Sequence, residues 1–259
     1  MAKILIRKGK KEFIKELNKE VQVVKPRTYY IKNIENDYHT TDGVISKKDL
    51  KKKDGSVVKT NNNKEFTIFT SSFPDDFRKI SRSAQIIPLK DIGLIIAETG
   101  LNKNSKVVDA GAGSGALACF LAHICKEVTT YEIRDDFFKI VQENKKNLDL
   151  KNLKVKNKDV YKEIDEKDVD LITLDLPSPW NAIKPAEKAL KIGGYLVSYS
   201  PTVPQVIDFV TVISSNENFL YIKTCELIKR NWDVEGRKVR PKSEGIGHSG
   251  FLTFCRKIR

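Results

Sequence analysis

The sequence contains few cysteines and histidines and no segment of the kind that crosses a membrane. It has four cysteines and three histidines in 259 residues. No apolar run approaches the roughly 18 residues that a membrane helix needs. The cysteines have none of the spacings of a metal site. We therefore expect no membrane association, no metal, and buried free thiols rather than a disulfide at Cys119, Cys125, Cys225 and Cys255.

The beginning of the sequence carries no recognisable secretory signal. Residues 1–11 are basic, but they contain no apolar stretch like the central region of a signal peptide. We therefore expect a cytoplasmic protein. Hydrophobic residues make up 40% of the chain. This length and composition suit one large domain, or a main domain with a smaller one.

Positive charge is abundant but unevenly distributed. The formal net charge is +13. Residues 1–80 contribute +8 (19 basic and 11 acidic residues), residues 81–220 contribute −1 (18 and 19), and residues 221–259 contribute +6 (10 and 4). A polyanion would therefore meet the two ends of the chain. A general enrichment in lysine, which the abundance of Asn and Ile also suggests, is the alternative explanation.

The first part of the chain has a β-rich pattern. Short runs such as Ile4–Arg7, Thr28–Ile31 and Phe66–Phe69 contain β-branched and aromatic residues, and Asp-Gly pairs provide turns between some of them. This pattern predicts a small basic all-β domain over residues 1–75. We expect it to contact nucleic acid and to take part in assembly.

The second part, residues 76–259, alternates strands with helices. This alternation predicts a doubly wound, Rossmann-like, mostly parallel sheet, with an antiparallel hairpin at its edge because no helix separates the last two strands. The strands are expected at 107–109, 128–132, 155–159, 169–176, 195–200, 221–229 and 250–255, and the helices at 116–125, 137–147, 185–191 and 204–216.

A glycine-rich loop follows the first of these strands. Val107–Asp109 leads into Gly111-Ala112-Gly113-Ser114-Gly115, and a helical pattern begins at Ala116. Glycines allow sharp turns and let a ligand approach main-chain N–H groups, while the helix N-terminus favours negative charge. The loop alone fits many nucleotide-binding folds.

Acidic residues at strand ends narrow the choice of ligand. Asp109, Glu132, Asp159 and Asp175 are all expected near carboxyl ends of strands, where such sheets bind ligands. Glu132 lies 23 residues after Asp109 in the sequence. An acidic residue at this spacing is typical of one that accepts hydrogen bonds from ribose hydroxyls. The loop differs from the Gly-x-Gly-x-x-Gly of dinucleotide enzymes. It suits a nucleoside cofactor that carries an amino acid, whose carboxylate would be held by main-chain N–H groups.

The loop resembles motif I of class I S-adenosylmethionine-dependent methyltransferases, and further motifs resemble one family among them. Asp175-Leu176-Pro177-Ser178-Pro179-Trp180 is similar to the Asp-Leu-x-x-Pro-Trp of the tRNA (adenine-N1)-methyltransferases that modify the T-loop adenosine. The segments Gly194–Val206 and Gly247–Leu252 are also similar to motifs of that family. Generic methyltransferases do not have the last two motifs.

This resemblance implies roles for particular residues. Asp175 would be the catalytic acid. Glu132 would hold the ribose, Phe137 would flank the adenine, and Asp159 would bind its amino group. The methionine end and the segment covering the cofactor would be formed by Gly111, Gly113, Ser114, Gly115, Ala116, Leu117, Gln85 and Ile87. It also implies tRNA as partner, position fifty-eight with its preceding neighbour as targets, and a homotetramer.

The proposed role of Asp175 agrees with the chemistry of methyl transfer to adenine. N1 already carries a lone pair, so it needs no strong base, but the purine becomes positively charged as the methyl group arrives. A carboxylate that accepts the N6 hydrogen bond would stabilise that charge in a dry pocket. One difference from the family is that Pro88-Leu89 replaces its usual aromatic or histidine residue followed by proline.

Some roles and functions remain open at this stage. Trp180 could pack beneath its loop or stack on a base, and His248 fits a structural turn, bonded to a backbone carbonyl, better than a catalytic role. Arg237, Lys238, Arg240 and Lys242 are expected to form a basic loop. A methyltransferase acting on another substrate, such as protein isoaspartate, would not need the basic N-terminal domain. A noncatalytic tRNA-binding subunit would be expected to have degenerate cofactor motifs, whereas these motifs are intact.

Overall fold

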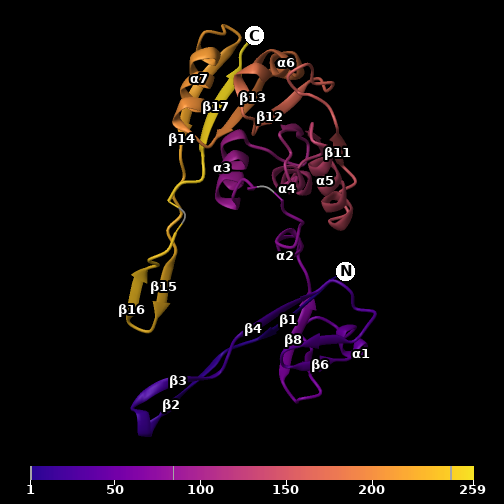
Figure 1. The fold of residues 1–259 in the computed structure, drawn as a ribbon, viewed down its shortest axis with the longest axis vertical. Helices are drawn as coiled ribbons and strands as arrows, with labels where there is room; N and C mark the ends of the chain where they lie inside the picture. Colours follow the sequence, from indigo (N-terminus) through magenta and orange to yellow (C-terminus); the bar gives the residue numbers. More distant parts are fainter. Residues whose placement is uncertain (1, 84, 246) are drawn as a thin grey trace. The chain divides into compact units, whose positions relative to one another are not determined.

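The structure is a computed structural model that describes residues 2–83, 85–245 and 247–259. The chain forms two compact units, Met1–Lys79 and Ile80–Arg259 (Figure 1). The sequence pattern placed the boundary after residue 75. Helix α2 (Phe73–Phe77) extends the first unit beyond that point, because the Tyr30 hydroxyl donates a hydrogen bond of 2.8 Å to Asp76.

The N-terminal unit is built on a four-stranded sheet in the order β4-β1-β8-β7, all antiparallel. From Glu65 to Ile68 in β8, exposed and buried residues alternate, so Phe66 and Ile68 enter the core. Two hairpins, β2–β3 and β5–β6, complete the unit. Its elements are β1 (Lys3–Arg7), β2 (Lys10–Ile14), η1 (Lys15–Leu17), β3 (Lys19–Val24), β4 (Arg27–Ile31), β5 (Tyr38–Thr40), β6 (Gly43–Ile45), α1 (Lys47–Leu50), β7 (Val57–Lys59), β8 (Glu65–Thr70) and α2.

The second unit contains the predicted doubly wound sheet. Its seven strands lie in the order β11-β10-β9-β12-β13-β17-β14, and those from β11 to β13 are parallel. The strands are β9 (Lys106–Ala110), β10 (Glu127–Tyr131), β11 (Leu153–Lys156), β12 (Val169–Leu174), β13 (Leu190–Ser200), β14 (Phe219–Cys225) and β17 (Phe251–Lys257). The prediction of a class I methyltransferase-like sheet is confirmed.

Helices connect these strands. Helix α4 packs on β9, β10 and β11, whereas α7 packs on β13, β17 and β14. The strand order reverses between β9 and β12, which makes this the switch point where such sheets bind ligands. The helices are α3 (Leu89–Thr99), α4 (Ala116–Ile124), α5 (Asp135–Asn147), η2 (Pro179–Ala182), α6 (Ile183–Ala189) and α7 (Val203–Ser214).

Besides shifts of a few residues at other element ends, three details of this unit differ from the sequence prediction. Strand β17 inserts between β13 and β14, antiparallel to both, so the expected hairpin is not a simple edge addition. Strand β11 ends at Lys156, so Asp159 lies in the following loop and not at the strand end. The expected basic loop is a hairpin of β15 (Trp232–Glu235) and β16 (Lys238–Pro241). It turns at Gly236, whose φ of +56° suits glycine.

The core of the second unit encloses the thiols. Cys119, Cys125 and Cys255 are buried and Cys225 is half-buried, and all four are free. Burial raises the pKa of the Cys119 and Cys255 thiols to about 12, so both stay protonated and unreactive at neutral pH. Within residues 2–83, 85–245 and 247–259, no helix is long and apolar enough to span a bilayer.

Candidate active site

The glycine loop connects β9 to α4 at the switch point. Its first two main-chain N–H groups, of Gly111 and Ala112, both donate to the carbonyl oxygen of Tyr131 at 3.1 Å. Gly111 has a φ of +85°, and a Cβ placed on it would lie 1.9 Å from the carbonyl oxygen of Asp175. Glycine is therefore required here, because the loop passes directly against the end of β12.

Asp109 lies at the end of β9 and is almost fully buried. Both of its carboxylate oxygens accept hydrogen bonds, from Thr130 at 2.7 Å and from Thr173 at 2.8 Å. Burial nevertheless raises its pKa, and the charge of Glu132 adds to the effect. With both oxygens occupied, Asp109 ties three neighbouring strands together beneath the loop.

The Asp175 carboxylate, unlike that of Asp109, lacks hydrogen-bond donors among the described residues. Asp175 follows β12, and its N–H donates to the carbonyl oxygen of Ala110 at 2.9 Å, which fixes its backbone beside the loop. In the described part of the chain no group donates a hydrogen bond to its carboxylate. Burial, with the nearby charge of Asp109, raises the pKa of Asp175 to about 7. Asp175 is thus a half-buried carboxylate with free acceptor capacity at a cavity wall.

The cavity beside Asp175 has a volume of about 520 Å³, within the range of small-molecule sites. Of the predicted residues it brings together Gln85, Gly111, Gly113, Glu132, Phe137, Asp159 and Asp175. A second hollow of about 20 Å³ shares four of these and adds Ile87, Ser114, Ala116 and Leu117. Gly115 lines neither. A Cβ there would lie 2.8 Å from Val141, so this glycine permits close packing of α4 against α5.

Glu132 is held in place by backbone groups on both sides. One carboxylate oxygen accepts the N–H of Gly113 at 2.9 Å, and the other accepts the N–H of Arg134 at the same distance. Asn157 donates to the Glu132 carbonyl oxygen at 3.2 Å. Glu132 is nearly buried, and it faces the cavity with a fixed orientation.

The remaining wall carries an aromatic ring and a loop carboxylate. Phe137 lies in the first turn of α5, and the Arg134 guanidinium lies 4.1 Å from the centre of its ring. Asp159 accepts the N–H of Tyr161 at 2.9 Å, which orders the loop after β11. The ring and the carboxylate together suit a planar heterocycle that bears hydrogen-bond donors.

Several lining residues escaped the sequence analysis. They lie within two positions of a predicted site residue, and apart from Leu176 and Pro177, which belong to the Asp175–Trp180 motif, they carry no motif of their own: Tyr131, Ile133, Arg134, Lys158, Val160, Tyr161, Leu176 and Pro177.

The segment before α3 carries the departure from the family pattern. Pro88 caps the N-terminus of α3, and Leu89 is 44% exposed at its first turn. No side chain of either residue lines the described cavity. Ile87 is buried and reaches the smaller hollow, and Gln85 lines both.

Beyond Pro88 and Leu89, α3 is joined to β17 by a buried polar cluster. The Lys90 ammonium donates to Asp91 at 2.8 Å and to Ser249 at 2.6 Å, and Ser249 in turn donates to Asp91 at 2.9 Å. Tyr199 donates to the carbonyl oxygen of Ser249 at 2.5 Å. The cluster braces the turn that begins β17.

His248, in the same turn, has a structural environment. Its Nε2 lies 2.9 Å from the carbonyl oxygen of Pro201, and its Nδ1 lies 2.5 Å from Glu226. The expected bond to a backbone carbonyl is therefore present. Trp180, in η2, packs against the main core cluster, in agreement with a packing role.

This geometry combines a glycine loop at a switch point, an oriented glutamate and a half-buried aspartate whose carboxylate accepts no hydrogen bond from the described residues. Residues 77–240, more than half of the chain, match the family described as "tRNA methyltransferase complex GCD14 subunit". The chain belongs to the GCD14 family. The resemblance noted from the sequence is thereby confirmed.

A relative from Methanocaldococcus jannaschii is similar over nearly its whole length. It is 34% identical, the match covers 89% of this chain and 91% of the relative, and it is named tRNA (adenine(57)-N(1)/adenine(58)-N(1))-methyltransferase TrmI. A TrmI from Thermus thermophilus, named for adenine 58, is 28% identical over 78% of this chain and 81% of its own.

Solved structures resemble this GCD14-family chain throughout both units. A tRNA methyltransferase TrmI from Aquifex aeolicus has a TM-score of 0.75 and 25% identity, covering 99% of this chain and 97% of its own. A protein from Thermotoga maritima described as an SAM-dependent O-methyltransferase has a TM-score of 0.80 and 27% identity, covering 99% and 93%. The fold thus recurs in proteins named for different acceptor atoms.

Proposed function

We propose that the protein transfers a methyl group from S-adenosylmethionine to N1 of an adenosine in tRNA. The targets are the adenosine at position 58 and its neighbour at position 57, the two positions named for the Methanocaldococcus relative. The observation that carries this proposal is Asp175, whose unpaired carboxylate lines the same cavity as Gly111 and Gly113. Membership of the family gives independent support.

The residues around the cavity fit the cofactor. Gly111 lies so close to the Asp175 backbone that no side chain fits between them, and Gly113 also has a positive φ of 53°. Main-chain N–H groups at the start of α4 would bind the amino-acid carboxylate, because those of Gly111, Ala112 and Gly113 already have partners. Glu132 would accept the ribose hydroxyls, Phe137 would cover the adenine, and Asp159 would accept from its amino group. Gln85 and Ile87 would close the cavity.

The cofactor, when bound, supplies a methyl group activated on a positively charged sulfur. Asp175 contributes to the reaction through the acceptor base. Its carboxylate accepts the N6–H of adenine, which orients N1 and stabilises the charge that develops on the purine. Because its pKa is about 7 before ligands bind, a nearby positive charge would favour the ionised form that this role requires.

The N-terminal unit provides a surface suited to the tRNA backbone. It contains a groove of about 1070 Å³ with six basic side chains and two acidic ones: Arg7, Lys8, Lys10, Lys25, Arg27, Lys64, Asp42 and Glu65. Asp42 is already paired with Arg7 at 3.0 Å, so the groove keeps a strong excess of positive charge. Phosphate groups favour such a surface.

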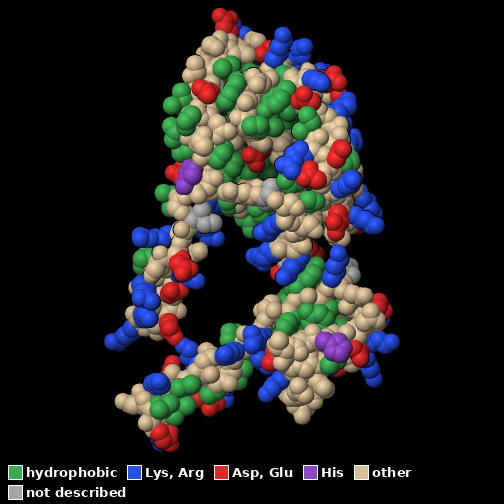
Figure 2. All heavy atoms as spheres, viewed as in Figure 1, with side chains coloured by type: hydrophobic (Ala, Val, Ile, Leu, Met, Phe, Trp, Pro, Cys, Tyr) green, Lys and Arg blue, Asp and Glu red, His purple; other side chains and the backbone are tan. Residues whose placement is uncertain are grey.

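The β15–β16 hairpin would add a second contact to tRNA. It carries Arg237, Lys238 and Arg240, and Lys242 follows it. Lysine and arginine side chains are visible along this hairpin and over the N-terminal unit in Figure 2. The target adenosine must leave its stack to reach Asp175, and a backbone held at both ends would assist that step.

Assembly into a homotetramer and a cytoplasmic location complete the proposal. Helix α7 and strand β14 expose apolar side chains that a second copy could cover: Val203, Ile207, Val212, Leu220 and Ile222. Hydrophobic side chains gather on this part of the second unit in Figure 2. Light scattering across a dilution series measures the assembly state, and a monomer at micromolar concentration would refute the tetramer.

The function is tested with labelled S-adenosylmethionine and unmodified tRNA transcripts. We expect label in N1-methyladenosine at position 58, lost when that adenosine is replaced by guanosine together with its neighbour at 57. A noncatalytic subunit would bind the transcript without labelling it. An enzyme for isoaspartate would label an isoaspartyl peptide and leave tRNA unlabelled. Either result would refute the proposal.

A further inference from the structure

Tyr131, the last residue of β10, contacts both loops that form the cofactor cavity. Its carbonyl oxygen accepts the N–H groups of Gly111 and Ala112. Its side chain reaches the other way, toward the loop between β11 and β12, where the hydroxyl donates to Glu166 at 2.6 Å and accepts the N–H of Asp165 at 2.9 Å. One residue thus holds the glycine loop with its backbone and the opposite loop with its side chain.

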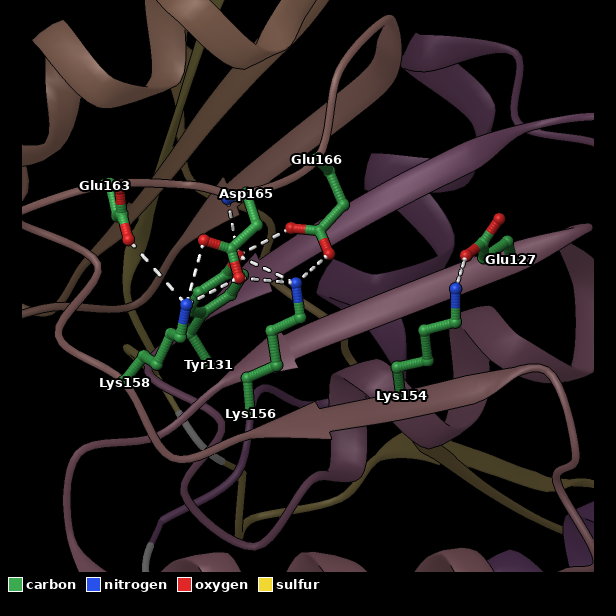
Figure 3. A network of polar contacts seen from close by, with 8 residues as sticks. All are labelled: Glu127, Tyr131, Lys154, Lys156, Lys158, Glu163, Asp165 and Glu166. Atoms are coloured by element: carbon green, nitrogen blue, oxygen red, sulfur yellow. Dashed lines mark hydrogen bonds and ion pairs between the residues drawn. The ribbon is translucent and has the colours of Figure 1, made fainter.

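Two lysines extend this contact into a network, drawn in Figure 3. The Lys156 ammonium lies 2.9 Å from Asp165, 2.5 Å from Glu166 and 3.5 Å from the Tyr131 hydroxyl. The Lys158 ammonium lies 2.9 Å from Asp165. Lys158 itself lines the cavity and directly precedes Asp159. The acidic pair therefore anchors the segment that carries the expected adenine contact.

The network pairs opposite charges and is partly shielded from water. Two lysines face the carboxylates of Asp165 and Glu166, Lys158 also lies 3.7 Å from the more exposed Glu163, and the Tyr131 side chain is buried. Burial opposes ionisation of Glu166, but the hydrogen bonds from Lys156 and Tyr131 lower its pKa below the usual value. Burial and the bond to Glu166 raise the pKa of Tyr131 to about 12, so the hydroxyl keeps its proton. The directions of all these bonds are therefore the same across the neutral range.

We propose that Tyr131 and the acidic pair Asp165–Glu166 are positioning residues that pre-organise the Lys158–Tyr161 wall for S-adenosylmethionine. This inference rests on the proposed cofactor. A wall held before binding loses less conformational freedom when the ligand arrives, so the network contributes to affinity and not to the methyl-transfer step. Asp175 follows a different strand, β12, and keeps its own backbone bond to Ala110.

The test compares Tyr131→Phe with the wild-type protein. This variant removes one oxygen, leaving the N–H of Asp165 and the Glu166 carboxylate without their shared partner. We expect about tenfold weaker binding of S-adenosylhomocysteine by calorimetry and a similar rise in the cofactor KM. We expect kcat at saturating cofactor to change less than twofold. Glu166→Gln, which keeps an acceptor for the hydroxyl, should restore most of the affinity lost in Glu166→Ala.

Strand β11 also provides a matched control. Lys154 forms an ion pair with Glu127 near the network (Figure 3), but its side chain is 62% exposed and it does not line the cavity. Lys154→Ala should leave the affinity for S-adenosylhomocysteine and the cofactor KM unchanged, because an exposed ion pair contributes little to the stability of the structure around it.

Hydrogen exchange gives a readout that needs no cofactor. In Tyr131→Phe we expect faster exchange of the amides of residues 158–161, with no change in α7. Unchanged exchange there, or equal affinity in Tyr131→Phe and wild type, would overturn the inference. If the wild-type protein bound neither S-adenosylmethionine nor its product, the proposed function would fail instead, and the exchange data would still report on the wall.

Discussion

The cavity of the second unit and the groove of the N-terminal unit differ in the burial, the hydrogen bonding and the charge of their side chains. Around the cavity, Asp109 and Glu132 are buried and each of their carboxylate oxygens has a partner, while the Asp175 carboxylate accepts no hydrogen bond from the described residues. In the groove, Lys8, Lys25 and Lys64 are exposed, and none of the three forms an ion pair within the described chain. One region holds buried, oriented acidic side chains, whereas the other is open and cationic.

This contrast assigns different tasks to the two regions. A fixed, low-dielectric site discriminates between charge distributions and suits the chemical step. Exposed lysines attract a polyanion without choosing its sequence, and salt weakens them. We therefore expect changes in the cavity to affect turnover or cofactor affinity, and changes in the groove to affect tRNA affinity alone.

Asp175→Asn should produce the largest effect and would separate the two regions most clearly. The amide keeps the size of the side chain but loses the charge that stabilises the developing purine cation. We expect kcat to fall by about 100- to 1000-fold. Binding of S-adenosylhomocysteine and of tRNA, measured by calorimetry and filter binding, should change less than threefold. Wild-type turnover in this variant would remove Asp175 from the mechanism.

Gly111→Ala should destabilise the cavity severely. The added Cβ would meet the Asp175 carbonyl oxygen at 1.9 Å, in addition to the strain of a positive φ. We expect a loss of about 3 kcal/mol in the free energy of unfolding, measured with urea, and no detectable cofactor binding.

Gly100→Ala is the matched control for Gly111→Ala. Gly100 also has a positive φ, of +66°, but a Cβ there would have no neighbour within 4 Å. It should cost about 1 kcal/mol from backbone strain alone. If both variants lost the same free energy of unfolding, the close approach at Gly111 would make no contribution to the destabilisation.

Replacing Lys8, Lys25 and Lys64 with alanine should weaken the groove and leave the cavity intact. We expect tRNA affinity to fall about tenfold at low salt. The slope of log K against log salt should decrease by about one for each phosphate that the variant no longer neutralises. Cofactor affinity should be unchanged.

The control for these lysines is a second triple alanine variant, at Lys103, Lys126 and Lys151. These exposed residues precede strands β9, β10 and β11. They therefore lie at the N-terminal ends of the strands, whereas the cavity lies at the carboxyl ends. This variant removes the same charge from the chain. If it weakened tRNA binding as much as the groove variant, net charge and not the groove would account for the affinity.

The smallest expected effect follows from the raised pKa of Asp175 and concerns how the stability of the fold changes with pH. Its folded-state value of about 7 exceeds the usual 3.8, so the ionised carboxylate disfavours the folded state as pH rises from about 4 to 7. Asp175→Asn should therefore raise the cofactor-free Tm by a few degrees at pH 8 and by less at pH 5. A gain that is equal at both pH values would contradict the raised pKa.

Much of the second unit was predictable because strands and helices alternate with strong local signals. The glycine loop, the parallel strands near it and the placement of Glu132 and Asp175 near strand ends follow from periodicity and turn residues. The β15–β16 hairpin was missed because charged residues obscured the alternation of Trp232 and Val234 with polar neighbours. Asp159 was placed on a strand because the apolar pattern near Val155 gives no sign of where pairing stops.

The sequence by itself determined the family, the Rossmann-like sheet and the acids of the site, since these depend on local patterns and on motifs of fixed spacing. The tertiary structure alone decided which acid is free. Asp109 and Asp175 look alike in the sequence, but neighbouring strands place Thr130 and Thr173 against the first and no donor of the described chain against the second. It also decided that Tyr131 joins two loops, because hydrogen bonds between residues more than thirty positions apart form only when the sheet has folded.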